Sequence, residues 1–324
     1  MSILVTGGAG YIGSHAAKAL ATAGLEPVVL DNLQRGHREA VKWGPLVEAD
    51  LSDRNALDRV FTQYSIQAVF HFAAFTYVGE SMQSPDLYFR NNTVNTLGLL
   101  EAMQAHGVQR LIFSSTAATY GNPLQTPIPE DHPQAPVNPY GESKRMVERL
   151  LHWWGVSHGL QSVALRYFNA AGADPQGELG EDHDPETHLI PLAIAAAMGA
   201  GKGLEVYGTD YDTPDGTAIR DYLHVTDLAV AHIAALRYLE NGGVSAAFNL
   251  GTGQGHSVRE VIDTVARVSG QKVPFREVGR RSGDPPSLVA DPRKSNTVLS
   301  WRPGHSSLEE IVQTAWLWKR NRRA

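Results

Sequence analysis

The first half of the chain alternates short apolar runs with longer segments in which apolar residues recur at helical spacing. The apolar runs predict buried strands at residues 3–6, 27–30, 46–49, 68–72, 111–115 and 162–166. Helical periodicity predicts helices at about residues 11–23, 54–64, 86–105 and 140–154. Strands and helices in this alternating order are typical of a parallel sheet with helices on both faces.

The pattern changes after about residue 168. Residues 174–186 and 208–216 are rich in glycine, proline and acidic side chains, which predicts loops, and a helix at 227–239 and a strand at 248–251 then resume the alternation. We therefore expect an α/β protein with a doubly wound, Rossmann-like parallel sheet and a smaller α/β substrate domain. The predicted cofactor domain comprises residues 1–168 and about 221–251, and the predicted substrate domain comprises about 169–220 and 252–324.

Composition narrows the class of protein. The chain has 324 residues, of which 42% are hydrophobic and 19% charged, as in an ordinary globular protein of one large or two medium domains. A net charge of −6 argues against a dedicated nucleic-acid binder, and the lack of cysteine excludes disulfides and thiol chemistry. No segment approaches the roughly 18 apolar residues of a membrane span, and the first residues read as a strand rather than a signal peptide. We expect a cytoplasmic protein without nucleic-acid or membrane partners.

Glycines fill the turn between the first strand and the first helix. Gly7, Gly10 and Gly13 satisfy G-x-x-G-x-x-G, and Gly8 with the last two satisfies G-x-G-x-x-G. Because glycine has no Cβ, the backbone can approach a pyrophosphate at the helix N-terminus. A tight turn alone is the alternative explanation for part of this pattern.

Asp31 ends the second strand, eighteen residues after Gly13. A carboxylate there accepts hydrogen bonds from ribose hydroxyls and repels a 2′-phosphate, which favours NAD over NADP. Arg35 is the counter-indication, since an arginine nearby suits such a phosphate. Further residues follow later strands, where ligands of parallel sheets bind: Asp50 and Leu51 on the adenine side, and Phe72, Ala73 and Ala74 near the phosphates.

Tyr140 and Lys144 lie four residues apart, on one face of a predicted helix. An ammonium beside a phenol favours the phenolate and lowers its pKa from about 10. Such a tyrosine can exchange a proton with a sugar hydroxyl near neutral pH while a nicotinamide takes the hydride. Thr116 ends a strand twenty-four residues before Tyr140, and its hydroxyl either bridges substrate and tyrosine or bonds to the backbone.

These features resemble the extended short-chain dehydrogenase/reductase family in order and approximate spacing. Motifs over most of the chain are similar to those of the nucleotide-sugar epimerases in that family, at residues 6–13, 31–33, 71–74, 78–81, 167–169 and 215–225. The resemblance implies tightly held NAD and epimerisation at C4 of a UDP-hexose, UDP-glucose or UDP-galactose, through a 4-keto intermediate. It also implies a homodimer in which the helices at 86–105 and around Tyr140 form a four-helix interface.

The resemblance assigns roles by position. The catalytic set is Thr116, Tyr140 as acid/base on the sugar 4-hydroxyl, and Lys144, which tunes Tyr140 and holds the nicotinamide ribose. The implied NAD site consists of Gly7, Gly10, Tyr11, Ile12, Gly13, Asp31, Asn32, Asp50, Leu51, Phe72, Ala73, Ala74, Asn91, Tyr140, Lys144 and Phe168. The implied UDP-sugar site consists of Thr116, Asn169, His188, Leu189, Tyr207, Arg220, Arg281, Asp284 and Leu288. Guanidinium groups suit a diphosphate, with surface ion pairs as the alternative for the two arginines.

Three residues depart from the family pattern. Thr76 stands where some of these epimerases carry lysine, and His188 stands where asparagine is familiar. Leu288 occupies a position that walls the sugar pocket and is often a bulky aromatic residue. Leucine leaves more room, so UDP-N-acetylhexosamine, UDP-pentose and UDP-uronate remain alternative substrates.

The sequence also bears on two other functions, dehydration and non-catalytic NAD binding, and on metal binding. A dehydratase on this fold is expected to carry Asp-Glu after the active-site threonine, whereas Ala117 and Ala118 follow Thr116 here. A non-catalytic NAD-sensing protein has no need of Thr116, Tyr140 and Lys144 together. His183 and His188 lie among acidic residues but in no recognised ligand motif, so the sequence predicts no metal site.

Overall fold

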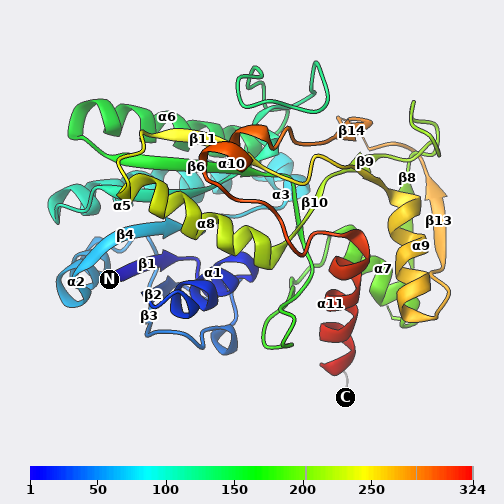
Figure 1. The fold of residues 1–324 in the computed structure, drawn as a ribbon, viewed down its shortest axis with the longest axis horizontal. Helices are drawn as coiled ribbons and strands as arrows, with labels where there is room; N and C mark the ends of the chain where they lie inside the picture. The colour runs from blue at the N-terminus through cyan, green and yellow to red at the C-terminus, as the bar shows by residue number, and fades with distance from the viewer. Residues whose placement is uncertain (201–202, 282, 323–324) are drawn as a thin grey trace.

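The main layer of the molecule is a sheet of seven parallel strands in the order β11-β6-β5-β4-β1-β2-β3 (Figure 1). The computed structural model describes residues 1–200, 203–281 and 283–322. The strands are β1 (Ser2–Thr6), β2 (Glu26–Asp31), β3 (Leu46–Glu48), β4 (Ile66–His71), β5 (Arg110–Thr116), β6 (Gln161–Tyr167) and β11 (Ala246–Leu250). They follow the predicted apolar runs, which confirms the Rossmann-like sheet.

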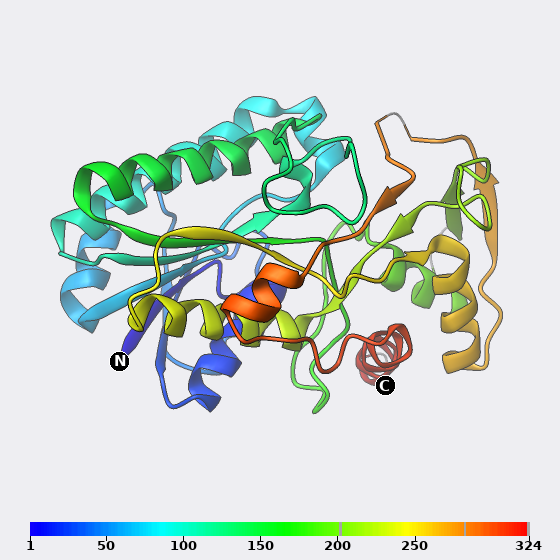
Figure 2. The same ribbon diagram turned by 45° about the horizontal axis from the view of Figure 1, so that its top comes forward.

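Helices cover both faces of this sheet (Figures 1 and 2). One face packs against α1 (Tyr11–Thr22) and α8 (Val225–Glu240), and the other against α2 (Arg54–Tyr64), α5 (Asn95–Ala105) and α6 (Pro139–His158). Helix α6 starts sharply because the Asn138 side chain accepts a hydrogen bond from Gly141 N at 2.8 Å and proline occupies the first position. It ends at Gly159, whose φ of 73° suits glycine.

The expectation of one regular helix over residues 86–105 is wrong. After α3 (Val78–Gln83), the chain forms α4 (Pro85–Tyr88), then a π-helical stretch at Phe89–Val94, and only then α5. The buried Asn92 lies in this stretch and bonds both backbone groups of Phe75, accepting at 2.8 Å and donating at 3.0 Å. Such bulges are rare and frequent at functional sites.

A second layer of short strands and helices lies to the right of the sheet in Figure 1. Its pairs are β7 (Asn169–Ala171) with β10 (Tyr222–His224), β8 (Leu204–Tyr207) with β13 (Phe275–Val278), and β9 (Ile219–Arg220) with β12 (His256–Ser257) and β14 (Ser287–Leu288). Helices α7 (Leu189–Ala197), α9 (Val258–Ser269) and α11 (Leu308–Asn321) share a separate core there. After α10 (Arg293–Val298), Leu299 and Trp301 pack into the core that the main sheet forms with α1 and α8.

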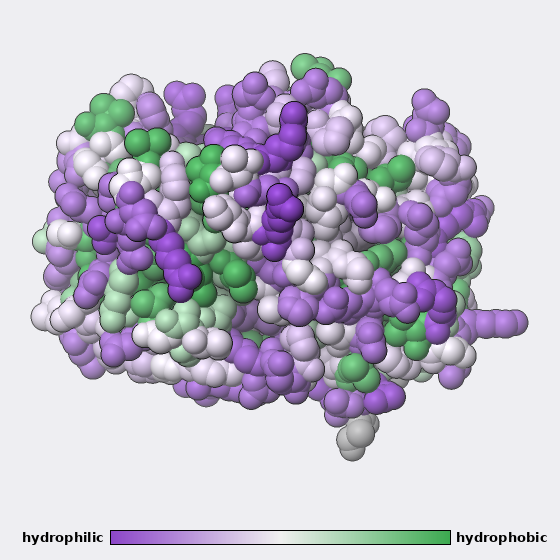
Figure 3. All heavy atoms as spheres, in the orientation of Figure 1, coloured by the Kyte–Doolittle hydropathy of each residue, from purple (hydrophilic) through white to green (hydrophobic). Residues whose placement is uncertain are grey.

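In Figure 3, apolar side chains lie together on the surface over α8. A cavity of ≈ 1070 Å³ lies there between α1, α8 and residues 298–301. None of the residues expected to bind cofactor or substrate lines it. Within the part of the chain that the structure describes, no helix combines the length and apolar character needed to cross a membrane.

Candidate active site

The turn from β1 into α1 brings backbone atoms unusually close. A Cβ on Gly7 would lie 2.5 Å from Ala73 N, and one on Gly13 would lie 2.2 Å from Gly7 O. Gly7 also has a φ of +71°. Gly10 precedes α1 without a side-chain cap, so no side chain covers the amides of the first turn. This cradle fits a dinucleotide pyrophosphate.

The predicted adenosine side lies beyond β2 and β3. Asp31 is 8% exposed and accepts hydrogen bonds from Ala9 N at 3.0 Å and Leu33 N at 2.9 Å, which fix its carboxylate at the strand end. Asn32 donates to Asp50 at 2.6 Å, so these two predicted residues meet. The arrangement can present oxygen acceptors to ribose hydroxyls.

Arg35 is engaged elsewhere. Its guanidinium pairs with Glu80 at 2.7 Å and lies 4.8 Å from the centre of the Tyr77 ring. The charge that would attract a 2′-phosphate is therefore already partnered. This geometry supports the preference for NAD over NADP.

Several predicted cofactor residues have packing roles as well. Leu51 is buried in the core beneath α2, and Ile12 packs against the other core. The Phe72 ring lies 4.7 Å from the ring of His232. Asn91 donates to the Asn92 side chain at 2.9 Å. Their side chains are held by the protein, and any contact with a ligand from Leu51 would come from its backbone.

The three predicted catalytic residues come together where the parallel strands end, beside the last residue of β5. We call this carboxyl-terminal side of the sheet the catalytic edge. Thr116 is the last residue of β5. Its hydroxyl accepts a hydrogen bond from Ala118 N at 3.1 Å and lies close enough to the Tyr140 phenol to lower the pKa of that group. The predicted bond to the backbone is thus present, and a bridge to the substrate stays a prediction. Lys144 is 2% exposed and donates from Nζ to Ser114 O at 2.9 Å.

The pKa of Tyr140 departs from the sequence prediction. Burial raises it, and the nearby Thr116 hydroxyl offsets this only in part. Burial also lowers the pKa of Lys144 to about 7. The expectation of a lowered tyrosine pKa is therefore wrong for this arrangement, because removal from water penalises both charged forms. The Lys144 amine faces the Ser114 carbonyl and the Phe113 ring, at 4.9 Å.

Sequence reasoning missed residues that hold the catalytic helix. Asn92 donates to Ser143 Oγ at 3.0 Å and so joins the π-helical stretch to α6. The Tyr167 hydroxyl bonds to Ser114, and burial, together with the nearby Tyr140 charge, raises the Tyr167 pKa. The signal that could have pointed to Asn92 and Tyr167 is a polar group in a segment that is otherwise expected to be buried.

A buried ion pair joins the catalytic helix α6 to strand β6. Arg166 binds Glu148 through two nitrogens, at 3.0 Å and 2.6 Å, and both side chains are about one-tenth exposed or less. Arg166 also donates to the Tyr120 hydroxyl at 3.0 Å. An arginine at the end of a predicted buried strand was the signal that could have found this pair.

The predicted UDP-sugar residues form a group around β9 and β14. The strand register places Leu288 directly beside Arg220, and Arg220 pairs with Asp284. The Arg281 guanidinium lies 3.8 Å from the centre of the Tyr207 ring. Five residues predicted from separate parts of the sequence are thereby brought to one side of the molecule.

Leu288 also connects this group with the catalytic edge. Leu288 and Phe168 both pack on a small cluster that contains Ala117 and Tyr120, directly after Thr116. Asn169 donates its amide to Asp221 O at 3.1 Å in the adjoining strand pair. His188 and Leu189 lie apart, at the N-terminus of α7, where His188 contacts glutamates.

The comparison with known proteins identifies the class that this fold and site define. The model of the NAD dependent epimerase/dehydratase family matches residues 3–251, and this chain belongs to that family. The family and its NAD cofactor confirm the sequence prediction.

Relatives extend the likeness over nearly the whole chain. A UDP-glucose 4-epimerase of Lacticaseibacillus casei is 51% identical over 322 residues, covering 99% of this chain and 97% of the relative. The crystal structure of UDP-glucose 4-epimerase from Brucella ovis in complex with NAD is 52% identical, with a TM-score of 0.96 over 98% of this chain and 97% of that one. The UDP-Glc/GlcNAc 4-epimerase from Campylobacter jejuni is 42% identical, with a TM-score of 0.87 and 99% coverage of both chains.

Proposed function

We propose that this protein interconverts UDP-glucose and UDP-galactose by NAD-dependent epimerisation at C4. The observation that carries this proposal is the meeting of Thr116, Tyr140 and Lys144 at the end of the sheet that carries the dinucleotide turn. Relatives that bear the name UDP-glucose 4-epimerase along nearly the full chain support the same reaction.

NAD, when bound, supplies a carrier that accepts a hydride from C4 and returns it. The glycine turn and Asp31 hold it, and the chain's own side chains handle the proton. Tyr140 takes the proton of the 4-hydroxyl and gives it back, with the Thr116 hydroxyl positioned between phenol and sugar. Because burial raises the pKa of Tyr140, its base form requires a positive charge nearby. Lys144, one helical turn away and with a pKa of about 7, supplies that charge in this proposal when it is protonated.

The reaction also requires that the protein bind the UDP part of the substrate firmly while the hexose stays free to rotate. Arg220 and Arg281 are suited to the diphosphate, because guanidinium groups bind paired phosphate oxygens. Leu288 lies beside Arg220 and presents only an aliphatic wall to the sugar. A 4-keto sugar held mainly through its UDP can rotate and show its other face to the cofactor.

Turnover without added cofactor tests the proposal. Purified protein is expected to convert UDP-galactose into a mixture with UDP-glucose, and denatured protein is expected to release dinucleotide. An absence of conversion, with no activity gained on adding NAD, would contradict it.

The second candidate substrate is the N-acetylated pair. The room left by Leu288 favours it, and the Campylobacter jejuni relative is named for both kinds of sugar. We expect Leu288→Tyr to suppress turnover of UDP-N-acetylglucosamine and to spare UDP-glucose. If kcat/KM of the unmodified protein favours the N-acetylated sugars by tenfold, which corresponds to about 1.4 kcal/mol, the primary assignment is wrong.

The domain division predicted from the sequence remains part of this proposal. Residues 1–168 with about 221–251 hold NAD, and residues 169–220 with 252–324 hold the UDP-sugar. The separate core of α7, α9 and α11 supports it. A cytoplasmic location is also part of this proposal.

A homodimer is the expected assembly. Helix α6 exposes Met146, Trp153 and Val156, the last two at 55% and 66%, and Val94 is exposed on the π-helical stretch that contacts α6. Apolar residues gathered in this way on a surface favour a protein contact. Light scattering should give about twice the chain mass of 35.2 kDa, and Trp153→Glu should give monomers. A monomeric unmodified protein at micromolar concentration would contradict the assembly.

A further inference from the structure

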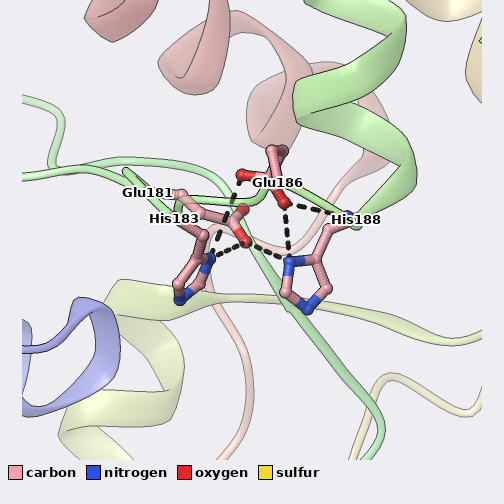
Figure 4. Close-up of side chains that lie close together, drawn as sticks. All are labelled: Glu181, His183, Glu186 and His188. Carbon is pink, nitrogen blue, oxygen red and sulfur yellow. Dashed lines mark hydrogen bonds and ion pairs between the residues drawn. The ribbon is translucent and has the colours of Figure 1, made fainter. Parts of the chain in front are cut away.

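The loop before α7 carries the same short spacing twice, Glu181 with His183 and Glu186 with His188. Figure 4 shows the four side chains turned toward one another, with the Nδ1 atom of each imidazole inward and the Nε2 atom outward. One potential ligand atom from each residue falls within a group whose members lie within 4.8 Å of one another.

The spacing of these atoms suits a small cation. His188 Nδ1 lies 2.8 Å from Glu181 and 2.9 Å from Glu186, and His183 Nδ1 lies 3.1 Å and 3.9 Å from the same two carboxylates. Four ligands at about 2.0–2.2 Å from a tetrahedral zinc ion lie roughly 3.3–3.6 Å apart. The observed distances lie on both sides of this range.

A single Nδ1 proton has to be shared between two carboxylates in this arrangement. Each imidazole has at most one proton on Nδ1, yet His188 Nδ1 is within hydrogen-bond distance of two carboxylate oxygens. The same Glu181 oxygen also faces His183 Nδ1. Glu186 is held in place by the backbone amides of residues 187 and 188, at 2.7 Å and 2.8 Å. Two carboxylates and two neutral imidazoles balance the charge of one divalent ion.

We propose that Glu181, His183, Glu186 and His188 bind one divalent transition-metal ion of the zinc type. Two imidazole nitrogens and two carboxylate oxygens suit zinc better than magnesium or calcium, which prefer oxygen ligands alone. The sequence predicted no metal because the loop matches no recognised motif. The proposal does not depend on the reaction assigned above.

The position of the site gives the ion a structural role. Glu181 is buried, and His183 lies against Tyr11 with 6.1 Å between ring centres. Tyr11 opens α1 and donates to Gly172 O at 2.6 Å, whereas His188 caps α7. The ion thus ties the loop to the starts of two helices. Coordination through Nδ1 leaves His188 Nε2 directed away from the ion, so the substrate role predicted for His188 is preserved.

Metal titration of untagged protein that retains its NAD tests the site. The protein is dialysed against a chelator, loaded with zinc sulfate and freed of excess metal before elemental analysis. We expect one zinc per chain, a higher melting temperature than in the chelated sample, and a tetrahedral visible spectrum when cobalt chloride replaces zinc. Less than half an equivalent of zinc, or no change in melting temperature, would overturn the proposal and leave a hydrogen-bonded cluster only.

Two variants and one control locate the binding. His183→Gln and Glu186→Gln each remove one ligand and should weaken zinc binding by at least about 100-fold, since even partners outside the coordination shell contribute 10–100-fold. His106→Gln is the control, because it removes an imidazole–carboxylate contact with Asp58 at the same 3.1 Å distance elsewhere. Unchanged zinc affinity in both folded variants would show that the metal binds at another place and would also overturn the proposal.

Discussion

The catalytic edge of the sheet and the UDP-sugar side of the molecule are built in different ways. Tyr140 and Lys144 share one turn of α6, and Thr116 ends β5, an inner strand of the sheet. Arg220 and Asp284 instead meet across 64 residues of sequence, on strands of two residues and the loop beside them. In the proposed function, rigid elements hold the catalytic residues, whereas short strands and loops carry the residues proposed to recognise the substrate.

The two regions also differ in exposure to water. Lys144 is almost completely buried, whereas Arg281 is exposed, and the Arg220 side chain lies between these extremes at 13% exposed. Changes at the catalytic edge should therefore alter turnover and stability. Changes on the UDP-sugar side should alter affinity.

The largest expected effect is that of Tyr140→Phe. Loss of the phenolic proton carrier should lower kcat by about 10²–10⁴-fold, while UDP affinity stays within twofold of the unmodified value. Steady-state kinetics and calorimetric titration with UDP measure the two quantities, with Tyr64→Phe on α2 as the control. Near-normal turnover in Tyr140→Phe would refute its role.

The buried ion pair between Arg166 and Glu148 should contribute more to the free energy of unfolding than an exposed pair does. Glu148→Gln leaves the buried Arg166 charge without its partner, which typically costs about 3–5 kcal/mol of unfolding free energy. Glu101→Gln breaks an ion pair of similar length, but with both side chains about half exposed, and should cost less than about 1 kcal/mol. Urea unfolding of the two variants makes the comparison, and equal losses would contradict it.

On the UDP-sugar side, Arg220→Met should weaken binding of UDP and raise KM with little change in kcat. Loss of hydrogen bonds from a charged group costs about 1.5–3 kcal/mol, or roughly 10- to 150-fold in affinity. Arg59→Met on the exposed face of α2 is the matched control. An equal fall in kcat with unchanged KM would place Arg220 in the chemistry rather than in the binding of UDP.

A change in stability smaller than that of Glu148→Gln, and of opposite sign, is expected for Lys144→Met, which should also be inactive. Because the folded-state pKa of Lys144 is about 7 and its ordinary value is 10.5, the unfolded chain binds more protons between these pH values. Stability of the unmodified protein therefore rises with pH through this window. The variant should be more stable by on the order of 2 kcal/mol below pH 7, with the difference vanishing toward pH 10.5.

Thermal unfolding across that pH range checks the gain, with the exposed Lys272→Met as the control. A variant that is less stable than the unmodified protein at pH 6 would show that burial of Lys144 carries no penalty.

The same contrast explains how far the sequence could be interpreted. The sheet, its helices and the glycine turn follow from periodicity and from residues with no Cβ, so they were predictable. The π-helical stretch was not, because it depends on how Asn92 bonds to Phe75 in the folded chain. The direction of the Tyr140 pKa was also missed, because burial is a property of packing rather than of the Tyr-x-x-x-Lys spacing.

The UDP-sugar side was reached only through resemblance. Nothing in the local sequence around Arg220 indicates that Asp284 is its partner or that Leu288 lies beside it. Such pairings arise when short strands from distant parts of the chain meet. The nearness of His183 and His188 to acidic residues was visible in the sequence, but the inward convergence of the four side chains was not, since loop conformation decides which atoms turn inward.

The central claim is that hydrogen leaves C4 of the sugar as a hydride and returns to the same carbon within one active site. UDP-glucose carrying deuterium at C4, incubated with the purified protein in ordinary water without added NAD, tests it directly. The account predicts UDP-galactose that retains the deuterium at C4. Exchange of the label with solvent would mean that C4 loses a proton rather than a hydride, and would contradict the account.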